Sequence, residues 1–148
     1  MGCPMGAYDD ETHPAPAQPV QLTPAAAGDP VFVGLPPRFP TLQWHSDTFE
    51  LPEGATLLAS SPAYLNQAFV IRRAYGLQFH LEVGRELASE WAQVPAYAES
   101  LETIMGLGSM PRLLEQVTEN ADELLPLARR LFASWLEHVV RVPARAIG

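Results

Sequence analysis

His80 and Glu82 are the residues whose types and spacing are best suited to acid–base chemistry. An extended backbone places residues i and i+2 on one face, so the two side chains can lie together. A carboxylate that accepts the Nδ1 hydrogen of an imidazole fixes its tautomer and leaves Nε2 as a general base. Taken alone, a His-x-Glu pattern is more commonly a chance pair on a solvated strand end than a catalytic pair. The position of this pair, where a β-rich run ends and a helical pattern begins, favours a site.

A second candidate group is formed by His45, Ser46 and Asp47. The types of His45, Asp47 and Thr48 suit a metal or acid–base cluster, but no further His or Cys follows at ligand spacing, so we expect no metal. The simpler structural interpretation is a polar strand end whose flanking aromatic residues, Trp44 and Phe49, pack in the core.

Short strands are the elements that must position both groups. Residues 20–23, 41–45 and 56–60 have strand character, and residues 68–72 and 75–80 flank a short turn, which predicts an antiparallel hairpin. The first forty residues hold nine prolines, which fix φ and remove backbone donors. We therefore expect only short extended pieces there.

Helical spacing replaces the β pattern after residue 83. Leu87, Trp91 and Val94 recur at intervals of four and three, and Pro95 is predicted to end that helix. After a break at residues 106–111, a broad apolar stripe over residues 111–140 predicts a helix packed on the sheet. Asn120 or Asp122 is suited to cap a second helix that starts inside this segment.

The composition excludes several functional classes. The 148 residues suggest a single folded domain, and the net charge of −8, with arginine as the only basic residue type, argues against nucleic acid or an anionic membrane surface as a partner. No apolar run is long enough to span a bilayer. A single cysteine, Cys3, rules out an internal disulfide and favours a cytoplasmic location.

Five ordered motifs together resemble the C-terminal half of class I glutamine amidotransferases, closest to their stand-alone, GMP-synthase-like branch. They are the 44–49 segment Trp-His-Ser-Asp-Thr-Phe, the 51–55 segment Leu-Pro-x-Gly-Ala, the 58–61 segment Leu-Ala-x-Ser, the 66–69 segment Asn-Gln-Ala-Phe, and the 75–82 segment Tyr-Gly-Leu-Gln-Phe-His-Leu-Glu. The resemblance implies an α/β fold: a partial, flavodoxin-like amidotransferase domain with a mixed sheet and C-terminal helices. Residues 1–40 would form a Pro-rich N-terminal segment and residues 41–148 the C-terminal half of that single domain.

The resemblance also implies a reaction and roles for the candidate residues. In this family a cysteine on a sharp strand-to-helix turn attacks the glutamine side-chain amide, and ammonia passes to a synthetic partner. His80 matches the base and Glu82 the carboxylate that orients it. His45, Ser46 and Asp47 match a segment that helps to place the substrate. No cofactor is implied.

The nucleophile of that family has no clear counterpart in this sequence. The Gly-x-Cys-x-Gly turn is absent, and the start of the chain instead resembles the glycine-rich oxyanion loop, through Gly2, Pro4, Met5 and Gly6, with Cys3 in place of a glycine. Cys3 has only two residues before it and Pro4 after it, which is a poor setting for a positioned thiolate. We expect the nucleophile-bearing block to be missing and glutaminase activity of the chain alone to be negligible.

Three hypotheses remain open from the sequence. The chain is an amidotransferase homologue with little or no activity, an active enzyme that uses Cys3 or a cysteine from another chain, or a non-catalytic interaction module. The last would use the acidic face of the helix over residues 111–140. The partners implied are glutamine, an ammonia-accepting synthetase, and a second copy or complementing chain that completes a sheet with exposed edges.

Overall fold

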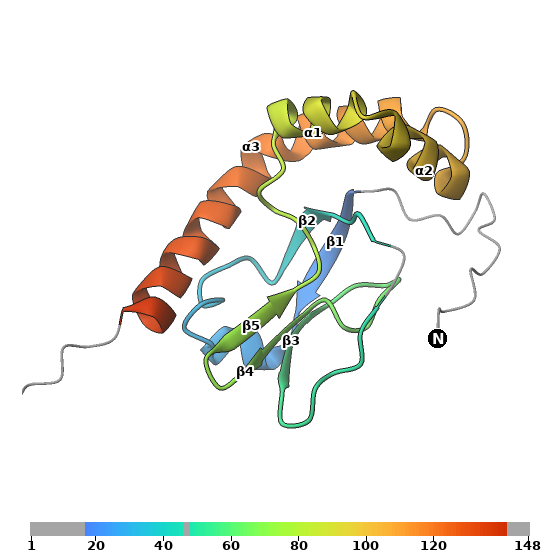
Figure 1. Ribbon diagram of the computed structural model, residues 1–148. Coiled ribbons are helices and arrows are strands. Elements are labelled where there is room, and N and C mark those ends of the chain that lie inside the picture. The colour runs from blue at the N-terminus through green and yellow to red at the C-terminus, as the bar shows by residue number, and fades with distance from the viewer. Residues whose placement is uncertain (1–16, 46–47, 142–148) are drawn as a thin grey trace, which may run out of the picture.

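The computed structural model describes residues 17–45 and 48–141, which form a curled sheet crossed by one long helix (Figure 1). In chain order the elements are β1 (Ala17–Leu22), the 3-10 helix η1 (Pro24–Gly28), β2 (Arg38–Leu42), β3 (Thr56–Ser60), β4 (Ala68–Ile71), β5 (Ala74–Leu77), α1 (Arg85–Ala92), α2 (Pro95–Met105), α3 (Ser109–Trp135) and the π-helical turn η2 (Leu136–Val140).

The five strands form a single sheet in the order β2-β1-β3-β4-β5. This arrangement, with helices following the strands, confirms the predicted α/β class with C-terminal helices. Among the described residues every strand pair is antiparallel, whereas a mixed sheet was expected. Consecutive strands here are joined by turns and loops, and a parallel pair requires a longer crossover, usually through an α-helix.

The predicted strands occur close to their expected positions, but β2 is shifted toward the N-terminus and β5 ends at Leu77, before the expected end at His80. β3 has the predicted bounds, and β1 contains most of the predicted 20–23 strand. β2 begins earlier than expected and ends at Leu42, so His45 lies beyond the strand. Pro19 and Pro40 face each other in the β1–β2 pair; β2 is an edge strand, and β3 pairs only with Gln21 and Leu22 of β1, so neither proline interrupts a second ladder.

The predicted hairpin is present as β4 and β5. The two-residue turn joins Ile71 to Ala74, and its first residue, Arg72, has a φ of 56°, as primed hairpin turns require. Gly76 lies opposite Phe69 in the ladder, and the Phe69 ring covers the glycine so closely that a Cβ at this position would come within 2.3 Å of it.

The helices follow the apolar spacing, with two differences from expectation. α1 ends before Pro95 as predicted, but Pro95 also begins α2, where a missing N–H costs nothing. α3 runs unbroken through Asn120 and Asp122, so the predicted second helix start is wrong. The apolar spacing continues across that point, and the helix is held by residues buried at intervals of three and four: Met110, Leu113, Val117, Ala121 and Leu124.

Two apolar clusters divide α3 between them. Its first half packs with α1, α2, Leu42 and Val83, and its second half packs over the sheet with Phe32, Phe39 and Phe79. The predicted apolar stripe of residues 111–140 is only partly buried: Phe132 is 59% exposed and Leu136 is 41% exposed. No helix among the described residues is long and apolar enough to cross a membrane.

Gly76→Ala is expected to lower the free energy of unfolding by about 1–3 kcal/mol, because the added methyl group would overlap the Phe69 ring. Urea denaturation measures the change. Gly28→Ala is the matched control, since a Cβ there meets nothing within 4 Å. Equal stability of the two variants would contradict the close packing of Phe69 on Gly76.

Candidate active site

His80 is held by its backbone at the end of β2. Its N–H donates to the Leu42 carbonyl at 2.8 Å, and the Leu42 N–H donates to the His80 carbonyl at 3.0 Å, which makes an isolated antiparallel bridge. The segment after β5 is thereby attached across the curled sheet to a strand far away in the sequence. The position of the imidazole is set by this pairing rather than by β5 itself.

Side chains alternate between two faces along residues 79–83, so that one face packs in the core and the other carries the site. Phe79, Leu81 and Val83 are buried, whereas the side chains of His80 and Glu82 point outward and are 34% and 62% exposed. The predicted period of two therefore holds through this segment, although it lies beyond the regular strand.

The predicted contact between the two side chains is present. His80 Nδ1 lies 2.8 Å from Glu82 Oε1, and the other carboxylate oxygen accepts the Leu81 N–H at 3.0 Å. The hydrogen bond with His80, with help from the Leu81 N–H, lowers the pKa of Glu82 although partial burial opposes this. Glu82 therefore stays ionised and holds the Nδ1 hydrogen, and within the described residues Nε2 has no hydrogen-bond partner.

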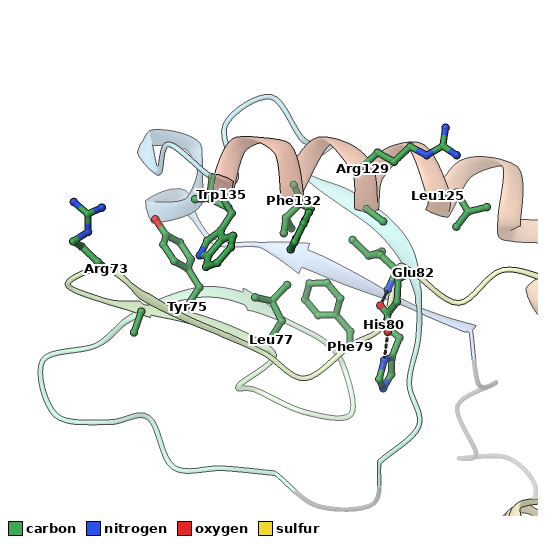
Figure 2. A pocket seen from close by; sticks show the side chains of 15 residues that line it. Arg73, Tyr75, Leu77, Phe79, His80, Glu82, Leu125, Arg129, Phe132 and Trp135 are labelled. Atoms are coloured by element: carbon green, nitrogen blue, oxygen red, sulfur yellow. Dashed lines mark hydrogen bonds and ion pairs between the residues drawn. The ribbon is translucent and has the colours of Figure 1, made fainter. Parts of the chain in front are cut away.

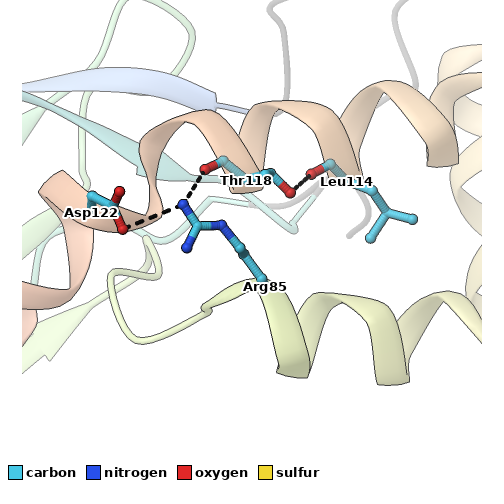
Figure 3. A network of polar contacts seen from close by, with 4 residues as sticks. All are labelled: Arg85, Leu114, Thr118 and Asp122. Carbon is cyan, nitrogen blue, oxygen red and sulfur yellow. Dashed lines mark hydrogen bonds and ion pairs between the residues drawn. The ribbon is translucent and has the colours of Figure 1, made fainter.

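Contacts from the helices position the His80 ring and the start of α1. The Trp91 ring of α1 meets the His80 ring edge-on, with centroids 6.1 Å apart, and Trp44 packs on Trp91 in turn. Arg85, just after the site, donates to the Thr118 carbonyl of α3 at 3.1 Å and pairs with Asp122 at 3.3 Å (Figure 3). The start of α1 is thus tied to α3.

His45 belongs to a separate polar network built from glutamines. Its Nδ1 lies 3.0 Å from Gln78 Nε2 and its Nε2 lies 2.9 Å from Gln43 Oε1, and its ring packs on Tyr64. Because an amide nitrogen can only donate, Nδ1 is the acceptor and Nε2 carries the hydrogen. Gln78 precedes His80 by two residues. The segment that carries His80 and Glu82 therefore also contacts His45, through Gln78.

Gln43 and Gln67 are network members that sequence reasoning did not single out. Gln67 is fully buried and its Nε2 donates to Gln43 Oε1 at 2.7 Å and to Ser61 Oγ at 3.0 Å. The available signal was that Gln67 and Ser61 both lie in the motifs that carry the family resemblance. Gln43 and Gln67 have neutral side chains that do not act as acids, bases or nucleophiles, so their residue type gave no reason to choose them.

Several predicted residues lie outside the described part of the chain. These are the substrate-segment residues Ser46 and Asp47, the only cysteine, Cys3, and the oxyanion-loop residues Gly2, Pro4, Met5 and Gly6. Among the described residues there is no cluster of three or more His, Cys, Asp or Glu that could hold a metal ion.

An apolar groove of about 900 Å³ runs from the His80–Glu82 pair along β5 and beneath the second half of α3 (Figure 2). Tyr75, Leu77 and Phe79 form its floor, and side chains of α3 form its roof. The remaining lining residues are Val31, Arg73, Ala74, Leu81, Leu125, Ala128, Arg129, Leu131, Phe132 and Trp135.

Asp29 fixes the floor of this groove at the end away from His80. One of its carboxylate oxygens accepts the N–H groups of Val31 and Phe32, and the other accepts the Tyr75 hydroxyl at 2.9 Å. Burial of the phenol, the hydrogen bond and the negative charge of Asp29 raise the pKa of Tyr75 to about 12. The Tyr75 ring also stacks on Phe32.

Solved structures identify the fold. A glutamine amidotransferase from Thermotoga maritima superposes with a TM-score of 0.70 and 35% sequence identity over 81% of this chain. The chain has a glutamine amidotransferase-like fold. A glutamine amidotransferase from Methylobacillus flagellatus, at a TM-score of 0.67 over 88% of this chain, has 22% identity and supports the fold alone.

The match covers only part of each amidotransferase. This chain spans 49% of the Thermotoga chain and 55% of the Methylobacillus chain. No protein-family model matches the sequence, and no curated protein is significantly similar to it.

The Glu82 carboxyl group is expected to titrate below the range of an ordinary glutamate, as measured by ¹³C NMR. His80→Ala should move the midpoint upward, because the hydrogen bond with His80 is the largest cause of the lowered pKa. The stabilisation from this pair is present at neutral pH and is lost as the pH falls through the pKa of Glu82. His138→Ala, on η2, is the control; an unchanged Glu82 midpoint in His80→Ala would contradict the pairing.

Tyr75 is expected to ionise near pH 12, and Asp29→Asn should lower its pKa by removing a negative charge beside the phenol. The raised pKa also predicts that stability falls as the pH rises from about 10 to about 12, since the unfolded chain loses the proton first. Residue-resolved ¹³C NMR measures the titration. Glu53→Gln, an exposed carboxylate on a turn, should leave Tyr75 unchanged.

Proposed function

We propose that this chain supplies the general base and its orienting carboxylate for hydrolysis of the glutamine side-chain amide to glutamate and ammonia. The observation that carries the proposal is the His80–Glu82 pair, with Nδ1 held at 2.8 Å and Nε2 left without a partner among the described residues. The amidotransferase-like fold supports it, because the same fold is found in the Thermotoga glutamine amidotransferase.

The pair is suited to one half of a nucleophilic mechanism. Nε2 would accept the proton of a thiol, and the resulting thiolate would attack the amide carbon. The imidazolium would return the proton to the departing nitrogen, which leaves as ammonia. Water, activated by the same imidazole, would then hydrolyse the thioester to glutamate and release the thiol. Glu82 would hold the tautomer throughout.

Other residues would support this reaction by placing the substrate and stabilising the oxyanion. His45, with Ser46 and Asp47 outside the described residues, would help to place the glutamine, and residues 2–6 would act on the oxyanion side. The motifs favour the GMP-synthase-like branch and an ammonia-accepting synthetase as the partner. A cytoplasmic location, predicted from the single cysteine, belongs to this proposal.

The thiol is the part of this mechanism for which the sequence offers no recognisable setting. The sequence contains no Gly-x-Cys-x-Gly turn, and Cys3 is its only cysteine. A base without a positioned nucleophile retains little catalysis. We therefore propose that the chain alone is inactive or nearly so, with use of Cys3, or of a cysteine from elsewhere, as the alternative.

Ammonia release from glutamine should be no faster with the chain alone than with its His80→Ala variant, because the only cysteine, Cys3, does not lie in a nucleophile turn of the Gly-x-Cys-x-Gly type. A coupled glutamate dehydrogenase assay measures the rate. Cys3→Ser separates the alternatives: release that depends on both His80 and Cys3 would identify Cys3 as the nucleophile and overturn the proposed inactivity. Release that survives both substitutions would contradict the roles given to these residues.

A further inference from the structure

The imidazole of His45 is engaged at both of its ring nitrogens. Nε2 lies 2.9 Å from Gln43 Oε1 and Nδ1 lies 3.0 Å from Gln78 Nε2, while the Tyr64 ring packs against the imidazole with centroids 4.7 Å apart. An imidazole has only these two hydrogen-bonding atoms. Any contribution of His45 to placing a substrate is therefore made through the position that its ring gives to the chain.

Gln67 lies behind both of the glutamines that hold His45. Its side chain is fully buried, and its Nε2 donates to Gln43 Oε1 at 2.7 Å and to Ser61 Oγ at 3.0 Å. Its backbone carbonyl accepts the Gln78 N–H at 2.9 Å. One residue just before β4 thus contacts Gln43 with its side chain and Gln78 with its backbone.

The buried amide of Gln67 decides the direction in which these hydrogen bonds run. Turning a glutamine amide by 180° exchanges its donor and its acceptor, so a reversed network could join the same side chains. In the observed direction both Nε2 hydrogens are used, and one buried oxygen, Oε1, has no partner among the described residues. In the reversed direction a buried NH₂ group with two unused hydrogens would take its place. Two unpaired donors cost more than one unpaired acceptor, so the observed direction is favoured.

Ser61 favours the same direction. Its Oγ accepts the Tyr64 N–H at 3.1 Å, and its hydroxyl hydrogen is directed to the Tyr64 carbonyl at 3.3 Å. A hydroxyl has one hydrogen only, so Ser61 meets Gln67 as an acceptor and Gln67 must donate. Gln43 Oε1 then accepts from both Gln67 and His45. His45 consequently carries its hydrogen on Nε2.

We propose that Gln67, directed by Ser61, is a positioning residue that fixes His45 in the Nε2–H tautomer, as a clamp between the end of β2 and the segment that carries His80. His45 then helps to place glutamine by holding the chain at this point, with its ring nitrogens committed to the clamp. The identity of the substrate rests on the proposed function. The clamp rests on the contacts of the described residues alone.

A direct contact between the His45 ring and the substrate is the competing interpretation. It would require a ring nitrogen to leave Gln43 or Gln78 and so to break a hydrogen bond that is at least partly buried. The new contact would have to offset that loss before it added anything to binding. The network therefore favours the positioning role.

The tautomer of His45 is the direct test and is measured on the full chain by long-range ¹H–¹⁵N NMR, at a pH where the ring is neutral. We expect a hydrogen on Nε2, none on Nδ1, and a scalar coupling across the hydrogen bond from Gln78 Nε2 to His45 Nδ1. A predominant Nδ1–H tautomer in the unmodified chain would overturn the proposal.

Gln67→Glu should reverse the tautomer without touching His45. An ionised carboxylate can only accept, so Gln43 should turn its amide nitrogen toward it and therefore toward His45 Nε2. The ratio of Nε2–H to Nδ1–H should fall by at least about tenfold. The ¹³C shift of the introduced carboxyl group reports its ionisation. Gln93→Glu, an exposed change of the same kind at the end of α1, should leave the ratio unchanged.

Gln67→Met keeps the side-chain length but removes both donors, so the coupling between Gln78 and His45 should weaken or disappear. Val117→Ala separates this effect from general destabilisation, because Val117 is buried in the helical cluster and does not belong to the network. It should lower stability and leave the coupling intact.

An unchanged tautomer ratio and coupling in both Gln67 variants would also overturn the proposal, as would equal losses in Val117→Ala. Ammonia release is not measured in these experiments. The clamp can therefore fail while the proposed function stands, and it can be present in a chain that fails the ammonia assay.

Discussion

The backbone bridge between His80 and Leu42 is the interaction on which the candidate site depends. Two hydrogen bonds join the segment after β5 to the end of β2 and fix the direction of the His80 and Glu82 side chains. Burial of Phe79, Leu81 and Val83 on the opposite face holds the same segment in register, because a slip by one residue would bury the polar pair. With the backbone fixed in this way, suitable side-chain rotamers of His80 and Glu82 are enough to form the Nδ1–carboxylate contact.

α3 connects this site to the rest of the molecule and covers only part of the apolar surface beside it. Its first half closes a helical core with α1 and α2, and Arg85 ties the residues beside Glu82 to it. Its second half leaves an apolar groove above β5 that extends to His80. The His80–Glu82 pair therefore lies at the end of a groove whose apolar surface is of the kind that folded proteins usually cover.

The match to a solved amidotransferase is partial, and an apolar groove lies beside the candidate site. This chain spans 49% of the Thermotoga amidotransferase, and its described part has an apolar groove beneath α3. The groove ends beside the His80–Glu82 pair. Fold similarity by itself does not establish activity, so the roles proposed for His80 and Glu82 need a direct measurement of ammonia release.

The sequence by itself determined the strands, the hairpin, the long helix and the His80–Glu82 pair, because each depends on local periodicity. Alternation of apolar residues predicted which side chains would be buried and which would meet. Tertiary structure alone decided the Leu42–His80 bridge and the glutamine network around His45. These depend on contacts between residues far apart in the sequence, where spacing carries no information. The groove beneath α3 belongs to the same class, since the apolar stripe of that helix does not show where the sheet beneath it ends.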